Sequence, residues 1–200
     1  MRVRIVGWSA LLIETEDVAE WRAELTRRCS TGELVATEIV PGERTVLLDG
    51  VPDPDRAAAA ISGWVPSSGA AVADGPVVEL PTVYDGEDLP LVARHWGVSV
   101  DEVVERHTGT GFRVAFCGFA PGFGYLTGLP EELAVPRLDT PRSRVPAGSV
   151  ALAGRYCGVY PTASPGGWLL IGHTATRLFD VEADPPALLA PGTRVLFVHA

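Results

Sequence analysis

The sequence contains no lysine, and all 16 of its basic residues are arginine. The chain itself therefore cannot supply a P-loop lysine, a lysine that forms a Schiff base, or a lysine that carries biotin. Three enzyme patterns are also missing: His-Glu-x-x-His, Gly-x-Ser-x-Gly, and a Gly-x-Gly-x-x-Gly placed between a strand and a helix. These absences argue against a self-contained zincin, serine hydrolase or dinucleotide enzyme.

Cysteine is scarce. Cys29, Cys117 and Cys157 lie far apart, with no Cys-x-x-Cys pair, so neither a disulfide framework nor a zinc site is encoded and no metal site is predicted. Cys117 has the apolar neighbours Phe116 and Phe119, which would raise the pKa of a thiol. A cysteine nucleophile is therefore disfavoured.

Long hydrophobic runs are absent as well. No stretch of about 18 apolar residues occurs, and residues 1–8 resemble a strand more than the start of a signal peptide. We expect a cytoplasmic protein with no membrane partner. The net charge of −9 and the scattered arginines argue against nucleic acid. With 200 residues, 46% of them hydrophobic, the chain can fill the cores of two globular domains.

What the sequence does have is glycine and proline among aromatic residues, in loops near 116–126 and 164–168. Glycine permits positive φ and proline fixes φ, so such loops can hold aromatic faces rigidly. Tight turns with their aromatics in the core are the alternative, but ordinary hairpins need only one or two special residues. We predict loop and interface residues here, namely Phe119, Pro121, Gly122, Phe123, Tyr125, Ser164, Pro165, Gly166, Gly167 and Trp168.

The first part of the chain, residues 1–83, has the pattern of an α/β domain. Apolar spacing predicts strands, helices and turns in the order β-α-β-β-α-β from residue 10, with an extra strand in front. The predicted strands are 2–6, 10–14, 34–40, 44–48 and 76–83, and the predicted helices are 17–29 and 53–64. This order is typical of a ferredoxin-like domain.

Residues 84–200 follow a different pattern. Two short helices are predicted at 87–96 and 99–107, the second with the capping box Ser99 to Glu102. Short strands separated by glycine and proline turns follow, at 112–118, 148–153, 156–160, 167–172 and 194–199. Many short strands of this kind predict a β-barrel or a sandwich.

Two histidines and three arginines are the polar candidates. His107 ends a helix, where it could act on a substrate or only stabilise the helix end. Arg137, Arg142 and Arg144 alternate with prolines, and arginine forks bind carboxylates or phosphates through parallel hydrogen bonds. An anion site is the prediction, and a solvated loop is the alternative. His173 follows the second aromatic loop and is a further ligand candidate.

Several of these segments resemble one known family. The matching segments are 118–126, Pro136-Arg137, Pro141-Arg142, 145–150, 153–154, 158–161, 164–168, 171–172 and 178–179. They are similar to the KipI/PxpB family, also called allophanate hydrolase subunit 1. Weaker matches at 10–12, 38–41 and 84–89 extend the resemblance over nearly the whole chain. The resemblance implies an α+β protein, with an N-terminal α/β domain followed by a cyclophilin-like β-barrel.

The resemblance also implies a function. It points to the smaller, non-autonomous subunit of an ATP-dependent 5-oxoprolinase, which converts 5-oxo-L-proline to L-glutamate and uses ATP in the assembled complex. The implied partners are a larger homologous subunit, of the PxpC or allophanate hydrolase subunit 2 type, and a third subunit of the PxpA type. In such a complex His107 would be catalytic, and Arg137, Arg142, Arg144 and His173 would bind the substrate or an anion.

Two alternatives come with the same family. One is a KipI-type inhibitor that binds a sensor histidine kinase, and the other is a subunit that processes allophanate or urea, as in urea carboxylase. The sequence departs from the family pattern at Cys117, at Cys157 and around Asp85. The first two departures further weaken a cysteine mechanism.

Overall fold

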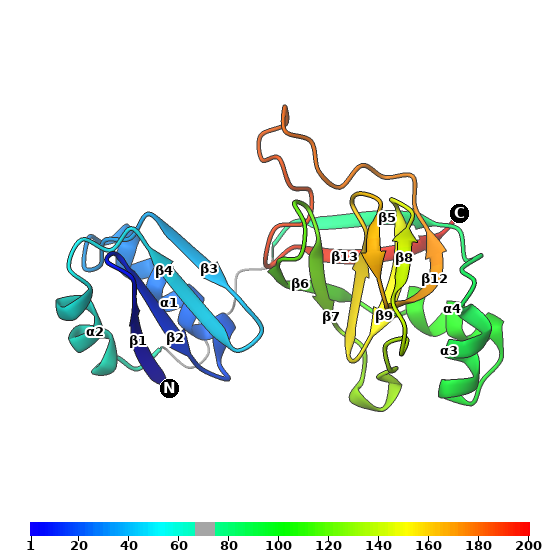
Figure 1. Ribbon diagram of the computed structural model, residues 1–200, viewed down its shortest axis with the longest axis horizontal. Coiled ribbons are helices and arrows are strands. Elements are labelled where there is room, and N and C mark those ends of the chain that lie inside the picture. Colours follow the sequence, from blue (N-terminus) through cyan, green and yellow to red (C-terminus); the bar gives the residue numbers. More distant parts are fainter. Residues whose placement is uncertain (67–74) are drawn as a thin grey trace. The chain divides into compact units, whose positions relative to one another are not determined.

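A computed structural model describes residues 1–66 and 75–200. The chain divides into two compact units, Met1–Asp74 and Gly75–Ala200 (Figure 1). The described residues form four α-helices and a set of short strands, so the protein is of the α+β class. Within these residues, no helix has the length and apolar character that crossing a membrane requires.

The first unit is an antiparallel sheet packed against two helices. The strand order is β1-β2-β4-β3. On β2, Leu11 and Ile13 are buried, and on α1, Trp21 and Leu25 pack against them one helical turn apart. The elements are β1 (Arg2–Val6), β2 (Ala10–Glu14), α1 (Val18–Ser30), β3 (Glu38–Pro41), β4 (Thr45–Asp49) and α2 (Pro54–Ser62).

The ferredoxin-like arrangement predicted for this part of the chain is not confirmed. Its last strand, β5 (Val77–Thr82), pairs in parallel with β13 (Arg194–His199) in the sheet of the second unit. In the first sheet, β1 takes the place beside β2 that the predicted arrangement gave to β5. β1 pairs with β2 in antiparallel fashion, from Arg2 opposite Glu14 to Val6 opposite Ala10. Apolar alternation identifies a strand but not the strand with which it pairs.

The second unit is a nearly closed mixed β-barrel with two helices. Its main sheet has the order β12-β9-β10-β7-β6-β13-β5, and β8 and β11 form a separate pair. The remaining elements are α3 (Leu89–Trp96), α4 (Val100–Thr108), β6 (Phe112–Cys117), β7 (Gly124–Thr127), a 3₁₀ helix (Glu131–Leu133), β8 (Arg142–Val145), β9 (Ser149–Ala153), β10 (Tyr156–Val159), β11 (Ser164–Gly166) and β12 (Leu169–His173).

The two edges of the main sheet meet at an isolated bridge between Val83 and His173. The N–H of Val83 donates to the carbonyl of His173 at 2.9 Å, and the N–H of His173 donates back at 2.8 Å. Farther along, the N–H of Asp88 donates to the carbonyl of Leu170 at 3.0 Å. These bonds join the segment after β5 to β12 and leave little free edge.

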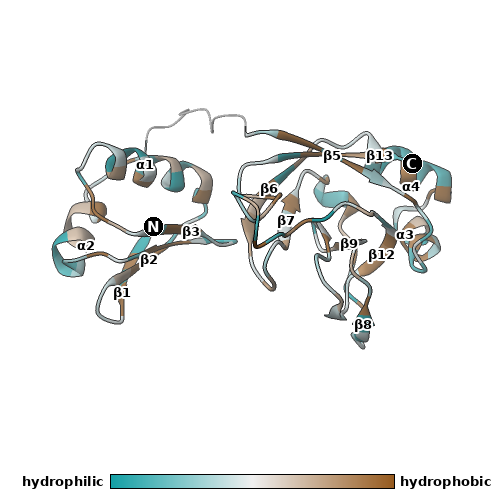
Figure 2. Ribbon diagram, turned by 90° about the horizontal axis from the view of Figure 1, so that it is seen from above, coloured by the Kyte–Doolittle hydropathy of each residue, from teal (hydrophilic) through white to brown (hydrophobic). Residues whose placement is uncertain are grey.

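The central strands of the barrel are buried on both faces. On β9, Val150 and Leu152 lie in the main core with residues of α3 and α4, while Ala151 and Ala153 lie in a second cluster that includes Val145 of β8. Side chains alternate between the two faces of a strand, so the β8–β11 pair covers the face opposite the main core. Figure 2 shows hydrophobic and hydrophilic residues side by side on α1 and α4, as expected for helices that bury one side.

The closure of the barrel predicts a cost for adding a methyl group at Gly172. A Cβ there would overlap the carbonyl oxygen of Val83 and lie 3.1 Å from the Cα of Tyr84. We expect Gly172→Ala to lower the free energy of unfolding by about 1 to 3 kcal/mol, because backbone atoms must move apart. Gly111→Ala is the matched control, because a Cβ at that position would have no heavy atom within 4 Å. Urea unfolding measures both, and equal stabilities would contradict the prediction.

Candidate functional site

His107 lies in the core of the second unit. Its side chain is fully buried, and its ring centroid is 5.0 Å from that of Phe112 and 4.5 Å from that of Phe197. Nδ1 is 2.7 Å from the hydroxyl oxygen of Tyr84, and Nε2 is 3.4 Å from Sγ of Cys157. Both ring nitrogens thus have partners inside the protein.

Burial keeps this group of side chains neutral. It lowers the pKa of His107 to about 3 and raises the pKa values of Tyr84 and Cys157 above their ordinary values. With the proton on Nε2, the phenol donates to Nδ1 and Nε2–H donates to the sulfur. A satisfied, buried imidazole of this kind is typical of a structural residue. A catalytic role for His107 stays a prediction, and the geometry favours a structural one.

Arg142 already holds a carboxylate of its own chain. Its Nη2 donates to both oxygens of Asp88, at 2.9 and 2.8 Å, and its Nε lies 2.6 Å from Oε1 of Glu87. Asp88 is nearly buried, and its Oδ2 also accepts from the N–H of Leu170 at 2.8 Å. The fork that was predicted to grip a ligand is therefore engaged in an internal ion pair. A ligand role for Arg142 stays a prediction.

The two glycine-hinged loops come together in one aromatic network. The ring of Phe123 lies at the centre, with centroids 5.4 Å from Tyr160, 5.4 Å from Trp168 and 5.1 Å from Tyr125. The interplanar angles of 66 to 83° are those of edge-to-face contacts, which aromatic quadrupoles favour. Phe119 extends the network, 5.3 Å from Phe123. The two loops predicted to carry interface residues thus lie next to each other, and their role in binding stays a prediction.

Phe119 is held in an unusual backbone conformation at the edge of this network. Its φ is 69°, and its side chain is 61% exposed. A bulky residue at positive φ costs about 1 to 3 kcal/mol, and such strain gathers at binding and active sites. Gly122 in the same loop has φ 82° and packs against Phe179, whereas Gly167 has no positive φ. The loop therefore presents an apolar ring at the surface.

The arginine-proline segment lies beside the aromatic network. The N–H of Leu138 donates to the carbonyl of Gly167 at 2.8 Å, which ties this segment to the second loop. Burial raises the pKa of Tyr160, while the N–H of Trp168 and the positive charge of Arg137 act in the opposite direction. Arg137 is therefore close enough to affect the phenol electrostatically. We call Phe119, Phe123, Tyr125, Tyr160, Trp168 and Arg137 the aromatic–arginine site.

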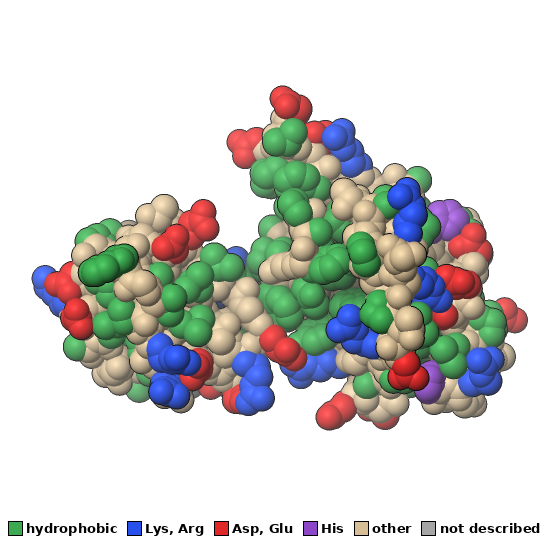
Figure 3. Space-filling model, viewed as in Figure 1, with side chains coloured by type: hydrophobic (Ala, Val, Ile, Leu, Met, Phe, Trp, Pro, Cys, Tyr) green, Lys and Arg blue, Asp and Glu red, His purple; other side chains and the backbone are tan. Residues whose placement is uncertain are grey.

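Arg137 and Arg144 are exposed, and neither makes an ion pair with the residues that the structure describes. Figure 3 shows hydrophobic side chains gathered over β6 and β7, with basic side chains next to them. In the second glycine-hinged loop, Oγ of Ser164 is buried and has no hydrogen-bond partner among the described residues. Such orphaned atoms are rare in native proteins and often mark a place for water or a ligand.

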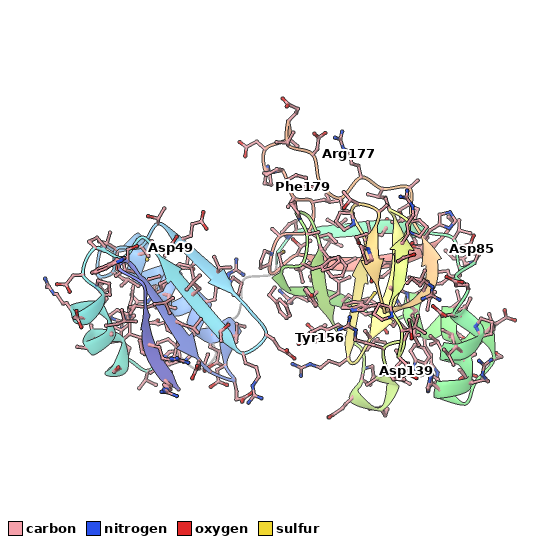
Figure 4. The ribbon with its side chains drawn as sticks, viewed as in Figure 1. Asp49, Asp85, Asp139, Tyr156, Arg177 and Phe179 are labelled. Atoms are coloured by element: carbon pink, nitrogen blue, oxygen red, sulfur yellow. The ribbon has the colours of Figure 1, made fainter. Side chains whose placement is uncertain are left out.

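His173 lies apart from this site, at the end of β12. Its Nδ1 is 2.8 Å from Oδ1 of Asp85, and both side chains are about half exposed. In Figure 4, Asp85 and Tyr156 lie on opposite sides of the second unit. The structure thus brings together the two loops and Arg137, and it leaves His107 and His173 elsewhere.

The aromatic network includes residues that the sequence did not single out. Tyr156 and Tyr160 flank Gly158 on one face of the β10 segment, and a Cβ at Gly158 would lie 2.9 Å from Phe123 and 3.0 Å from Trp168. The sequence pattern that could have identified these residues is tyrosine, glycine and tyrosine at alternate positions of one strand. Glycine there leaves room for two rings.

A family model described as carboxyltransferase domain, subdomain C and D, matches residues 1–189, and the chain belongs to that family. Its KipI/PxpB resemblance is confirmed by relatives that are named as subunits of 5-oxoprolinase. The Escherichia coli O157:H7 protein is 50% identical over 138 residues, 68% of this chain and 63% of the relative. The Bacillus subtilis (strain 168) protein is 46% identical over 126 residues, which are 62% of this chain and 52% of the relative.

This chain thus spans less than two thirds of the length of these relatives. Among solved structures, TTHA0988 has a TM-score of 0.77 and 33% identity, over 100% of this chain and 40% of that one. PH0987 from Pyrococcus horikoshii has a TM-score of 0.60 and 34% identity, over 100% of this chain and 97% of that one. Kluyveromyces lactis urea carboxylase has a TM-score of 0.66 over 99% of this chain and 21% of that one, but at 20% identity it shows the fold alone.

The burial of His107 predicts a particular pH dependence of stability. Because its pKa is about 3 in the folded state and 6.5 as the ordinary value, the unfolded chain binds a proton in this window that the folded chain does not. The free energy of unfolding should fall as the pH falls below about 6.5, by about 1.4 kcal/mol per pH unit from this residue.

His107→Gln removes the titration and keeps a hydrogen-bonding group. We expect the variant to be less stable at pH 7 but to lose about 2 kcal/mol less than the wild type between pH 7 and pH 5. Urea unfolding at both pH values measures the difference. Parallel losses in the two proteins would show that His107 does not titrate in this way.

Proposed function

We propose that this chain is the smaller subunit of an ATP-dependent 5-oxoprolinase and contributes part of a shared site for the hydrolysis of 5-oxo-L-proline to L-glutamate. The observation that carries the proposal is the 44 to 50% identity to three relatives named as subunits of 5-oxoprolinase. The partners in the proposal are a larger homologous subunit and a third subunit of the PxpA type. ATP acts in the assembled complex, which we place in the cytoplasm.

The aromatic–arginine site suits such a substrate. 5-Oxoproline has a carboxylate and a small, flat lactam ring. The unpaired guanidinium of Arg137 can hold the carboxylate through two parallel hydrogen bonds, and the exposed ring of Phe119 can pack against the lactam.

The edge of the site lies at the protein surface, which supports an active site shared with another subunit. Phe119 is 61% exposed, and catalysis of lactam opening requires that bulk water be kept from the reacting groups. A larger subunit seated on Phe119 would cover the site and could add the acid and base that this chain does not gather there. The finer assignment of the second unit as a cyclophilin-like barrel is part of the same proposal.

The other functions implied by the resemblance have less support. The likeness to urea carboxylase is at 20% identity, so it carries no argument for urea chemistry. The kinase-inhibitor alternative stays a prediction without an observation in its favour. Ligand roles for Arg144 and His173 also stay predictions, since each lies outside the aromatic–arginine site.

The proposal is tested by reconstitution. The purified chain is assayed alone and together with the larger and third subunits for release of glutamate and phosphate from 5-oxoproline and ATP, and assembly is followed by size-exclusion chromatography. We expect turnover only in the complete mixture, because the chain has no lysine and no nucleotide motif. Turnover by the chain alone, or a stable complex without 5-oxoproline hydrolysis, would overturn the proposal.

A fork at Arg137 predicts a strong effect of a conservative change. Arg137→Lys keeps the charge but loses one of two parallel bonds to a carboxylate. We expect the KM for 5-oxoproline to rise about tenfold or more in the assembled complex, the loss that a charged hydrogen bond of about 1.5 kcal/mol implies. Arg94→Lys on α3 is the control, since that arginine is also exposed and makes no ion pair within residues 75–200. An unchanged KM in Arg137→Lys would show that Arg137 does not bind the substrate and belongs to a solvated loop.

A further inference from the structure

The loop between β6 and β7 contains a γ-turn centred on Phe119. The N–H of Ala120 donates to the carbonyl of Gly118, two residues back, at 2.8 Å, and φ of Phe119 is 69°. A γ-turn with positive φ at its central residue is rare and strained. Among the residues that the structure describes, Phe119 is the one non-glycine residue with positive φ. The conformation favours glycine, yet the chain has phenylalanine there.

The surrounding backbone holds this turn in place. The N–H of Gly118 donates to the carbonyl of Phe123 at 3.2 Å, and the N–H of Phe123 donates to the carbonyl of Ala120 at 2.9 Å. Gly122 has φ 82°, and a Cβ added to it would lie 2.7 Å from another side chain. Strained backbone of this kind persists only where the neighbouring structure fixes it. The loop therefore fixes the direction in which the side chain of Phe119 leaves the backbone.

The ring of Phe119 gains too little from folding to offset the strain. It makes edge-to-face contacts with Phe123, at 5.3 Å and 71°, and with Tyr160, at 6.1 Å and 86°, but it stays 61% exposed. A side chain that is mostly exposed contributes little hydrophobic stabilisation. Strained residues gather at binding sites, where the position of a side chain matters more than its effect on stability. Strain and exposure together indicate a ring that is placed for contact with another molecule.

The surroundings of the ring indicate the class of that molecule. The positive charge of Arg137 acts on the phenol of Tyr160, and the ring of Phe119 contacts the same phenol. Arg137 is exposed and makes no ion pair among the described residues. An aromatic ring and a guanidinium beside one phenol suit a small molecule that has both a flat ring and a carboxylate. 5-Oxo-L-proline, the substrate in the proposed function, has both.

We propose that Phe119 is a specificity-determining residue, whose strained γ-turn holds its ring against the flat face of the lactam while Arg137 binds the carboxylate. This inference rests on the proposed function, because it assigns one part of the proposed substrate to one residue of the aromatic–arginine site. Phe119 then selects ligands that contain the lactam ring and does not contribute to binding of an open-chain carboxylate.

Two small compounds separate the two parts of the substrate. 2-Pyrrolidone has the lactam ring without the carboxylate, and glutarate has a carboxylate on an open chain. Binding of each to the assembled complex is measured by NMR titration without ATP, so the measurement does not depend on turnover. In Phe119→Gly we expect the Kd of 2-pyrrolidone to rise about fivefold or more, the scale of one aromatic contact, and the Kd of glutarate to stay within about twofold.

Three further variants complete the comparison. Phe119→Tyr keeps an aromatic ring and should bind both compounds like the wild type. Arg137→Lys should show the reverse of Phe119→Gly, with weaker binding of glutarate and unchanged binding of 2-pyrrolidone. Val181→Gly is the matched control, because Val181 is an exposed apolar residue of the same unit outside the aromatic–arginine site, and it should bind both compounds normally.

The strain is tested by comparing glycine with alanine at the same position. Phe119→Gly should melt about 2 to 4 °C above Phe119→Ala, since glycine adopts positive φ without strain and alanine does not. At Val181, which is 74% exposed and has no positive φ, the alanine variant should be at least as stable as the glycine variant. The same order of stabilities at both positions would show that Phe119 is not strained and would overturn the inference.

The remaining outcomes distinguish this inference from the proposed function. Unchanged binding of 2-pyrrolidone by Phe119→Gly, or an equal loss of both compounds, would overturn the role of the ring. Normal binding of both compounds with weaker association of the larger subunit would make Phe119 an interface residue and would also overturn it. If the complete wild-type mixture does not hydrolyse 5-oxoproline, the proposed function fails, and titration of the full chain alone with 2-pyrrolidone still decides whether Phe119 recognises a lactam. Absence of such binding by the wild type would overturn the inference whether or not turnover is seen.

Discussion

The buried ion pair between Asp88 and Arg142 connects three parts of the second unit that no shared sheet would hold together. Asp88 precedes α3, Arg142 begins β8, and Asp88 also accepts from the N–H of Leu170 on β12. The side chain of Asp88 makes no capping bond to α3, because its oxygens are already engaged. Removing Arg142 would leave the buried carboxylate of Asp88 without its ionic partner, a loss that costs about 3 to 5 kcal/mol. Because β8 pairs only with β11 among the described strands, this contact fixes the covering pair over the barrel.

The aromatic network depends on the β8–β11 pair, which covers it on one side. Val145 of β8 lies in the same buried cluster as Phe123, Tyr160 and Trp168, so the covering pair closes one side of the rings. Gly158 then allows two rings to lie over β10 without a side chain between them. The result is a rigid aromatic layer in which only the edge residues, Phe119 among them, reach the surface. Rigidity of this kind lets a site hold a ligand or a partner without a large loss of side-chain entropy.

Local patterns in the sequence predicted most elements of the fold. The helices expected at 87–96 and 99–107 are found at Leu89–Trp96 and Val100–Thr108, and the strand expected at 194–199 is found at Arg194–His199. What the sequence could not supply was long-range pairing. β5 looked like the end of the first domain, yet its partner is β13, more than a hundred residues away. The short strands β8 and β11 were missed because arginine, proline and glycine dominate them, and the four-residue strand β7 was missed because it lies within a loop rich in glycine and proline.

The same reasoning explains why the site was predicted only in part. His107 and His173 look alike in the sequence, since each is followed by threonine. In the structure, apolar rings surround His107 and lower its pKa to about 3, whereas His173 is 50% exposed beside the carboxylate of Asp85. An ionised carboxylate only accepts hydrogen bonds, so Asp85 fixes the proton of a neutral His173 on Nδ1 and leaves the lone pair of Nε2 free. Of the two histidines, only His173 has the exposure that proton transfer to or from a substrate requires. Residue type therefore narrows the candidates for a site, and burial decides among them.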